Sequence, residues 1–411
     1  MGSLCCRPAT VHDEPTTSVI IPRSHDIDPI GHLLVFINPN SGSGKGVKIF
    51  KKRVASQFEK NNISYELIIT NGPNHARNVV LTHANLHKFN GIVILSGDGL
   101  VFEVVNGLSE RSDAVKVVPS MPIGIIPSGS GNGMLSSVFV TKGWTLKNPG
   151  FLKQSVVVAT GVKPEAQPVN LLHVQTERKN VAAFLSIGWG IMADIDIESE
   201  RFRSSLGSQR FVAGAIIRCL SLRSYPGRLS YKPYAGKANF SQTPPFEVYG
   251  TSRCDMLSVE TDNSMRCETP ERRSKDNFWR ERHLINVPDL EDTLPDDWIS
   301  IEDEFIGVYA MSLSHIATDG PYMPLAKLDD DRIYLTFVMK KDIKGKFDMF
   351  KMLSAIETAK HLELGFVKCI QVSAFRLETL DQKSVIVVDG EVMDARKLQV
   401  TSTNLKTAVF T

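Results

Sequence analysis

One aspartate in a glycine-rich turn is the residue of this chain best placed to do chemistry. Asp98 lies in the turn Ser96-Gly97-Asp98-Gly99, which follows the apolar run Ile92–Leu95 and precedes hydrophobic residues at helical spacing over 101–108. The pattern predicts a buried strand, a sharp bend and a helix, because glycine adopts backbone angles that other residues resist. Such strand ends bind ligands in open α/β sheets, and a helix start offers N–H groups to phosphate. A carboxylate there would hold a metal or accept a proton; the plainer alternative is a helix cap.

Two further loops have the same context. Residues 33–46 read LLVFINPNSGSGKG and residues 123–133 read IGIIPSGSGNG, each an apolar run followed by Gly, Ser and Asn. Three such loops would gather at one edge of a parallel sheet, where their N–H groups can bind phosphate. The spacing does not match a Walker A loop, because Pro39 stands where that motif has glycine, and it does not match the dinucleotide fingerprint, because Val47 stands at its third glycine. The pattern therefore predicts a different nucleotide cradle.

Composition limits the class of protein. The chain has 411 residues, 42% hydrophobic and 22% charged, which is typical of a globular protein of two domains. A formal net charge of +2 gives no electrostatic reason to expect nucleic acid. The six cysteines show no zinc-like spacing and are too sparse for a disulfide framework, so we expect a reducing, cytoplasmic setting.

The three loops together resemble the lipid kinases of the diacylglycerol-kinase catalytic superfamily. The matching segments are Asn38–Lys45, Ser96–Gly99 and Pro127–Asn132, and Leu100 with Glu103–Leu108 resembles the sphingosine kinase branch. The resemblance resumes at Trp189–Glu200 and at Val388–Glu391. It implies an α/β nucleotide-binding domain, a β-rich lipid domain, and ATP with Mg²⁺ as cofactors.

The resemblance also implies a set of nucleotide-binding residues. These are Asn38, Asn40, Ser41, Gly44, Lys45, Thr70, Ser96, Gly97, Gly99, Glu103, Gly129, Ser130, Gly131, Arg203, Arg210, Asp389, Gly390 and Glu391. Phosphoryl transfer needs positioning, charge neutralisation and an acceptor for the hydroxyl proton, and we expect Asp98 to be that acceptor. The metal ligands stay unassigned. Asn40 stands where some relatives have a basic residue, which puts one phosphate contact in doubt.

An acidic stretch carries the substrate prediction. Asp194-Ile-Asp196-Ile-Glu198 alternates acid and apolar residues, and a strand would point the three carboxylates to one face. By resemblance, Asp196 binds the ammonium of a sphingoid base and orients its primary hydroxyl. Phe202 replaces a tyrosine common in the family. The other substrate-binding residues that the resemblance implies are Glu200, Phe211, Ile216 and Leu220.

The chain divides into three expected regions. Residues 1–30 are polar and interrupted by prolines, which indicates a flexible tail, and residues 31–153 alternate strand and helix signals typical of a parallel sheet. Residues 154–411 contain many short strands, which predict an antiparallel sandwich. Within it we expect strands at Ser155–Thr160 and Pro244–Gly250, and a mobile insertion over about 254–300. Amphipathic helices are expected over Arg210–Arg223 and Phe347–Leu364.

The first residues leave membrane attachment open. Gly2 could carry a myristoyl chain and Cys5 or Cys6 a palmitoyl chain, and two chains would anchor the protein stably. Cys6 stands where the usual motif has Ser or Thr, so an unmodified tail is the alternative.

These observations predict an ATP-dependent sphingosine kinase that is peripherally associated with a membrane surface and makes sphingosine-1-phosphate. Diacylglycerol kinase and ceramide kinase are the alternatives within the enzyme class, since their substrates lack the free ammonium. A catalytically inactive lipid-binding scaffold is the alternative outside it. Protein partners cannot be assigned from the sequence.

Overall fold

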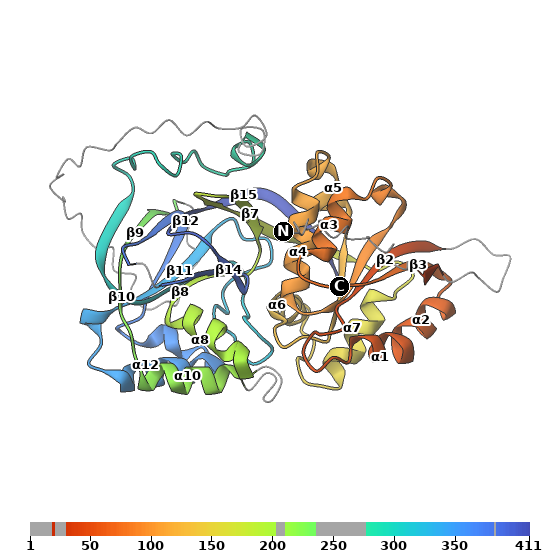
Figure 1. The fold of residues 1–411 in the computed structure, drawn as a ribbon, viewed down its shortest axis with the longest axis horizontal. Coiled ribbons are helices and arrows are strands. Elements are labelled where there is room, and N and C mark those ends of the chain that lie inside the picture. The colour runs from red at the N-terminus through yellow and green to blue at the C-terminus, as the bar shows by residue number, and fades with distance from the viewer. Residues whose placement is uncertain (1–18, 21–29, 203–209, 236–276, 382–383) are drawn as a thin grey trace, which may run out of the picture.

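The computed structural model describes residues 19–20, 30–202, 210–235, 277–381 and 384–411. Figure 1 shows two halves side by side, one rich in helices and one rich in strands, joined by the long strand β15 (Lys397–Phe410). The expected fold class is confirmed, because the first half has a parallel sheet and the second an antiparallel one. Arg203, the expected strand Pro244–Gly250 and the N-terminal acylation sites lie outside the described residues.

The first half is an α/β layer built on four parallel strands. They are β2 (Gly31–Ile37), β3 (Ile63–Ile69), β4 (Gly91–Ser96) and β5 (Ile123–Pro127). Their order is β3-β2-β4-β5, and β1 (Val19–Ile20) adds an antiparallel edge to β3. β4 is buried on both faces, as the apolar run Ile92–Leu95 predicts. Since the strands are parallel, the segments that follow β2, β4 and β5 meet at one edge of the sheet.

Helices cover both faces of this sheet (Figure 1). They are α1 (Gly46–Ile49), continued by a π-helical turn (Phe50–Val54) into α2 (Ala55–Lys60), then α3 (His75–Thr82), α4 (Asp98–Ser109), α5 (Ala114–Ser120), α6 (Gly133–Thr141) and α7 (Gly150–Ala159). The strand expected at Ser155–Thr160 was wrong, because its first five residues belong to α7 and Thr160 is the C-cap of that helix. Phe151, Ser155 and Ala159 are buried at a spacing of four, so packing on β5 overrides the β-propensity of the valines between them.

The second half is antiparallel. Its strands are β6 (Ala166–Thr176), β7 (Asn180–Ala183), β8 (Ser186–Gly190), β9 (Tyr225–Pro233), β10 (Ile299–Met311), β11 (Ile333–Met339), β12 (Lys368–Thr379), β13 (Ile386–Val388) and β14 (Glu391–Met393). β9 pairs with both β10 and β12, so strands β9 to β12 close into a ring around an apolar interior.

Three helices pack on one side of these strands. They are α8 (Ile191–Ser199), α10 (Arg210–Leu220) and α12 (Lys346–Ser354). Together they form a small apolar core, to which α12 contributes Met349 and Met352. The strand geometry expected for Asp194–Glu198 was wrong. Gly190 has a φ of +76°, and the chain turns there from β8 into α8. Ile191, Ile195 and Ser199 of α8 then form a buried stripe at helical spacing.

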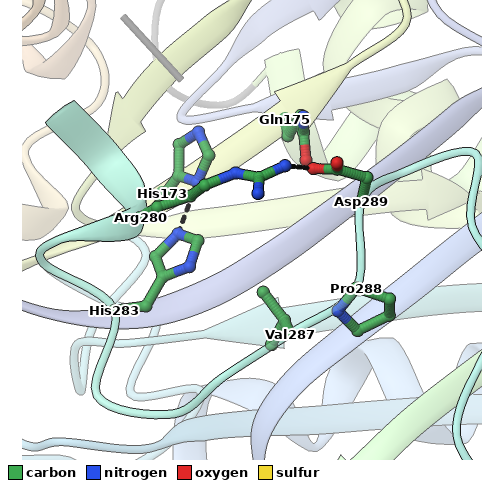
Figure 2. A pocket seen from close by; sticks show the side chains of 7 residues that line it. All are labelled: His173, Gln175, Arg280, His283, Val287, Pro288 and Asp289. Carbon is green, nitrogen blue, oxygen red and sulfur yellow. Dashed lines mark hydrogen bonds and ion pairs between the residues drawn. The ribbon is translucent and has the colours of Figure 1, made fainter. Parts of the chain in front are cut away.

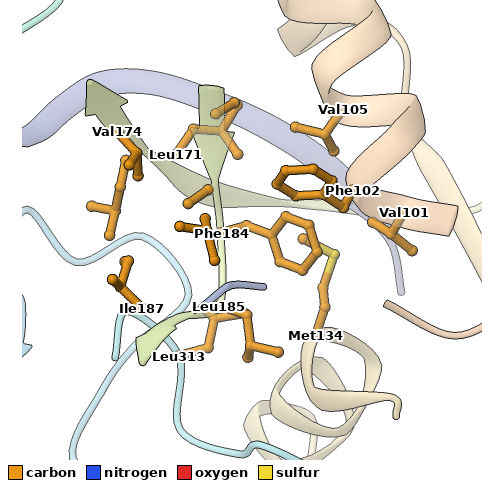
Figure 3. Close-up of a cluster of buried hydrophobic side chains, with 14 of the residues drawn as sticks. Val101, Phe102, Val105, Met134, Leu171, Val174, Phe184, Leu185, Ile187 and Leu313 are labelled. Carbon is orange, nitrogen blue, oxygen red and sulfur yellow. The ribbon is translucent and has the colours of Figure 1, made fainter. Parts of the chain in front are cut away.

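The two halves share one hydrophobic core. Figure 3 shows Phe102 and Val105 of α4 and Met134 of α6 against Phe184, Leu185 and other residues of the β-rich half. The last strand crosses the same boundary, because β15 pairs with β12 and β6 and, at Val409, runs parallel to β5. The chain's last strand thus returns to the α/β sheet, which the expected division at residue 154 did not include.

Part of the predicted insertion is packed against the antiparallel sheet. Residues 254–276 lie outside the described residues, whereas Trp279 and Trp298 are buried and Trp279 stacks on His173 at 4.7 Å between ring centroids. The polar composition that indicated a mobile segment concealed these two buried side chains. The mobility of the insertion stays a prediction. Figure 2 shows a small pocket between this segment and β6. In it, Nδ1 of His173 lies 2.8 Å from Nε2 of His283. No residue predicted to bind nucleotide or lipid lines it.

Candidate active site

The three glycine-rich loops interlock at the carboxyl edge of the parallel sheet. The hydroxyl of Ser96 donates to that of Ser41 at 3.0 Å, and the N–H of Ser128 donates to the carbonyl of Ser96 at 3.1 Å. A Cβ on Gly129 would lie 2.7 Å from the backbone nitrogen of Gly97. Backbone meets backbone here with no room for a side chain, so glycine is required for the loops to approach this closely.

The cradle contains buried polar atoms that lack a partner. Among the described residues, the hydroxyl of Ser128 and the side-chain oxygen of Asn132 are buried without a hydrogen-bond partner. Buried polar groups are ordinarily paired, and unpaired ones in a native fold need an explanation. Phosphate oxygens would accept from the Ser128 hydroxyl and from the loop N–H groups. The residues present therefore fit a nucleotide phosphate.

Asp98 is held at the start of two helices. Its carboxylate accepts hydrogen bonds from the N–H groups of Gly133 at 2.6 Å and Met134 at 3.2 Å, at the start of α6, while its own N–H donates to the carbonyl of Gly131 at 3.1 Å. Burial raises the pKa of Asp98 to about 6, although the two N–H donors lower it. A carboxylate with this pKa is ionised at neutral pH and is a stronger base than an exposed aspartate.

The first loop and its neighbours shape one side of the cradle. The side-chain oxygen of Asn38 accepts from the N–H of Asn40 at 2.9 Å, and Gly44 has a φ of +69°. Thr70, at the end of β3, is buried with its N–H bonded to the carbonyl of Ile37 at 2.8 Å. The side chain of Lys45 is exposed.

Glu103 has a structural contact. Its carboxylate accepts from the N–H of Ala76 at 3.1 Å, which caps the first turn of α3. This contact ties α3, which follows Thr70, to α4, which begins at Asp98. This contact therefore supports a role for Glu103 in positioning the edge of the cradle.

The turn between β13 and β14 reaches the cradle from the β-rich half. A Cβ on Gly99 would lie 3.1 Å from a carboxylate oxygen of Glu391, and a Cβ on Gly390 would lie 3.8 Å from a carboxylate oxygen of Asp196. The turn thus lies between the loop of Asp98 and the acidic helix α8. The structure brings together predicted residues that are separated by almost 300 positions in the chain.

Asp389 is held differently from its neighbours in this turn. Its carboxylate accepts three hydrogen bonds, from the N–H groups of Phe184, Leu185 and Ser186, at 2.8 to 2.9 Å. Burial raises the pKa of Asp389 to about 7, against the effect of these donors. The carboxylate thereby secures the connection between β7 and β8, which is a structural role.

The acidic helix α8 is clamped by arginines of α10. A guanidinium nitrogen of Arg210 lies 3.9 Å from Asp196, and Arg210 also donates to Glu200. On another face of α8, Asp194 accepts from the hydroxyl of Tyr225 at 2.5 Å and lies 3.6 Å from Arg218. The helical period therefore separates the acids into two sets, with Asp196 and Glu200 in the set that contacts Arg210.

The three predicted lipid-contacting residues of α10 differ in exposure. Phe211 is partly buried against the cluster of Ile195, Cys219 and Met349. Ile216 and Leu220 are 47% and 69% exposed. Phe211 thus faces the interior of the β-rich half, and the other two face outward.

Three functional contacts have no clear signal in the sequence. Met134 supplies a backbone N–H to Asp98, which no side-chain pattern reveals. Asn132 fixes the third loop by donating to the carbonyl of Gly129 at 3.2 Å. Asn106 of α4 exchanges two hydrogen bonds with the backbone of Ala182, at 2.9 and 3.0 Å, across the two halves. A buried asparagine within an apolar helix was the only available sign of the last contact.

This arrangement is that of a two-domain lipid-kinase-type fold. Residues 32–162 match the diacylglycerol kinase catalytic domain family. A crystal structure from Bacillus anthracis, assigned as a diacylglycerol kinase, superimposes with a TM-score of 0.57 at 15% identity and covers 92% of this chain and 97% of that one. At this identity the likeness concerns the fold.

Relatives of higher identity define the family. Sphingosine kinase 1 of Caenorhabditis elegans is 45% identical over 390 residues, which are 92% of this chain and 81% of that protein. Sphingosine kinase 1 of Homo sapiens is 31% identical over 372 residues, covering 89% of this chain and 87% of that protein. The chain belongs to the sphingosine kinase family.

Proposed function

We propose that this protein transfers the γ-phosphoryl group of ATP to the primary hydroxyl of a sphingoid base, giving sphingosine-1-phosphate or a close analogue. The observation that carries the proposal is that one turn contacts both sides of the site. In the turn between β13 and β14, Gly390 lies beside Asp196 and Glu391 lies beside Gly99. A lipid ammonium at Asp196 would direct its adjacent hydroxyl toward the loop of Asp98, on the other side of the same turn. Similarity to named sphingosine kinases supports the same assignment.

Asp98 accepts the hydroxyl proton in this proposal. Phosphoryl transfer depends chiefly on positioning and charge stabilisation, and the loop N–H groups, Ser128 and Arg210 are the described groups suited to phosphate. Mg²⁺ neutralises the phosphates when bound. No group of three or more His, Cys, Asp or Glu side chains that could hold a metal ion occurs in the described part of the chain.

Transfer of labelled γ-phosphate from ATP to sphingosine, ceramide and diacylglycerol, measured in parallel with Mg²⁺, tests the proposal. We expect product with sphingosine, and at least about a ten-fold lower kcat/KM with Asp196→Asn, because a charge-assisted contact to the ammonium contributes about 1.5–3 kcal/mol. Product mainly from diacylglycerol would overturn the substrate assignment and retain the role of Asp98. An absence of transfer to any lipid would favour the scaffold alternative.

We further propose that the helices α10 and α12 face a membrane. Val212, Ile216 and Leu220 of α10 and Phe347 and Phe350 of α12 are 47 to 77% exposed, and the two helices are joined by a hydrogen bond from Lys346 to the carbonyl of Leu220 at 2.5 Å. These five residues are called the apolar patch below. No helix among the described residues is long and apolar enough to cross a bilayer. A cytoplasmic enzyme that collects its lipid from a membrane surface, with or without acylation at Gly2, is part of the same proposal.

A further inference from the structure

Arg210 is a buried cation with two acidic contacts and one unused donor. Its side chain is 5% exposed, it donates to Glu200, and one of its terminal nitrogens lies 3.9 Å from Asp196. Its Nε–H is buried and finds no acceptor among the described residues. The guanidinium therefore contacts acids of α8 and the residue after it, while its Nε–H is a buried donor whose missing partner needs an explanation.

The contact with Asp196 conflicts with binding of a lipid ammonium. In the proposed function, Asp196 pairs with the ammonium of the sphingoid base, at the place where Arg210 already supplies a positive charge. The carboxylate is 30% exposed and the guanidinium is buried, so water screens repulsion between the two cations poorly. The base must therefore displace Arg210 from Asp196 or bind weakly.

A nucleotide offers Arg210 another partner. Phosphate oxygens fit the planar donor fork of a guanidinium, and the Nε–H with a neighbouring terminal N–H forms such a fork. We propose that Arg210 exchanges Asp196 for nucleotide phosphate, and that this exchange removes one positive charge from the place where the lipid ammonium binds. ATP and the sphingoid base then bind with positive cooperativity, and each strengthens the other by the same factor. This inference depends on the proposed function for the identity of both ligands.

The experiment measures the Kd of sphingosine in detergent micelles with and without a non-hydrolysable ATP analogue and Mg²⁺, using the full chain. In the wild type we expect the analogue to tighten sphingosine binding by at least about five-fold, the lower end of typical allosteric coupling. In Arg210→Met, which keeps the apolar stem without the charge, sphingosine alone binds more tightly than in the wild type. The analogue then has almost no further effect.

Two controls separate the exchange from other roles of Arg210. N-acetylsphingosine has no ammonium, so the analogue leaves its affinity unchanged. Arg223 lies 3.4 Å from Glu198 of the same helix α8 and is 54% exposed, so Arg223→Met removes an ion pair of α8 and retains the coupling. If Arg210→Met fails to fold, Arg210→Lys replaces it: the cation stays near Asp196, the fork is lost, and the coupling shrinks.

The outcomes distinguish this inference from the proposed function. Wild-type affinity that does not respond to the analogue, or equal coupling in wild type and Arg210→Met, would overturn the exchange. If Asp196→Asn still weakens sphingosine binding in that case, the ammonium site survives. If Asp196→Asn leaves sphingosine binding unchanged, the ammonium site itself is wrong, and the exchange fails with it.

Discussion

In the proposed reaction Asp98 accepts the proton of the lipid hydroxyl, and the pKa of Asp98 sets the pH at which it can act. Burial raises that pKa from 3.8 to about 6, so the carboxylate is ionised above this pH and protonated below it. As a general base it must be ionised, so we expect kcat/KM to be level above about pH 6 and to fall about ten-fold for each pH unit below it. A pH profile of labelled phosphate transfer between pH 4.5 and 8.5 measures this.

Asp98→Asn tests the same role without changing pH. A lost general base lowers kcat by about 10²–10⁴-fold, while binding of a fluorescent ATP analogue is expected to persist. Asparagine keeps an oxygen acceptor for the N–H of Gly133 or of Met134 and loses the other bond, so a thermal melt accompanies the assay to check that the fold is retained. Near-normal turnover in this variant, or a wild-type profile that stays level to pH 4.5, would show that another group takes the proton.

At this scale the sequence revealed residue types better than their contacts. The glycine turn around Asp98 was predictable because strand, turn and helix follow one another locally. The environment of Asp389 was not, because its three N–H donors come from residues 184–186, two hundred positions earlier. A carboxylate that secures a turn and one that contacts a ligand look the same in a sequence.

The loops act as one element because they pack backbone against backbone. A Cβ on Gly129 would lie 2.7 Å from the nitrogen and 2.8 Å from the Cα of Gly97, and 2.9 Å from the hydroxyl of Ser41. Gly129→Ala must separate the third loop from the turn of Asp98 and from Ser41 of the first loop. We therefore expect about 1–3 kcal/mol of lost stability and at least about a ten-fold weaker Kd for ATP. Thermal melts and nucleotide titration measure both effects.

Gly72→Ala is the matched control for that substitution. Gly72 lies in the same half, and a Cβ there would meet nothing within 4 Å, so stability and nucleotide affinity stay at wild-type values. If Gly129→Ala binds ATP as well as Gly72→Ala does, the close approach of the loops has no part in the cradle.

Helices and strands were predictable where the spacing of apolar residues in the sequence matches the side chains that the fold buries. The strand β4 and helix α4 follow their hydrophobic spacing, whereas α7 and α8 do not follow the simplest reading of theirs. Five residues that alternate acid and apolar side chains, as in Asp194–Glu198, fit a period of two. Only the buried stripe of Ile191, Ile195 and Ser199 shows the helical period, and recognising it requires knowing which surface is covered.

The whole molecule depends on long-range pairing that no local pattern encodes. β15 pairs with β12 of the closed ring and, at its end, with β5 of the parallel sheet. There the ring of Phe410 packs directly on Gly91 and Gly124, where an added Cβ would lie only 2.7 and 2.8 Å from the ring. Partner choice among strands is set by global packing, so a division into consecutive regions could not show it. The consequence for the site is that α4, which begins at Asp98, and β8, which leads into the helix of Asp196, contribute to one core. This shared core fixes the loop of Asp98 relative to α8.

The outer shape of the β-rich half bears on how a lipid reaches this site. In Figure 1, α10 and α12 lie together along one edge of that half, and α5 lies at the opposite edge of the molecule. The apolar patch on α10 and α12 is flanked by exposed Lys344 and Lys351, a combination suited to an anionic bilayer. Partial insertion of the apolar patch would place α10, and with it the acidic helix α8, near the membrane and would leave the parallel sheet in water.

Substituting both exposed phenylalanines tests this orientation. Phe347→Ser with Phe350→Ser removes two aromatic rings, each of which contributes about 1.5–3 kcal/mol when fully buried, so we expect at least about a ten-fold loss of binding to vesicles containing anionic lipid. Transfer to sphingosine in those vesicles falls with it, whereas transfer to a soluble short-chain sphingoid base is unchanged. Val115→Ser on α5, which is 52% exposed, is the control and leaves vesicle binding intact. Vesicle binding that survives the double substitution would exclude α12 from the membrane-facing surface, since these two rings are its large exposed apolar groups.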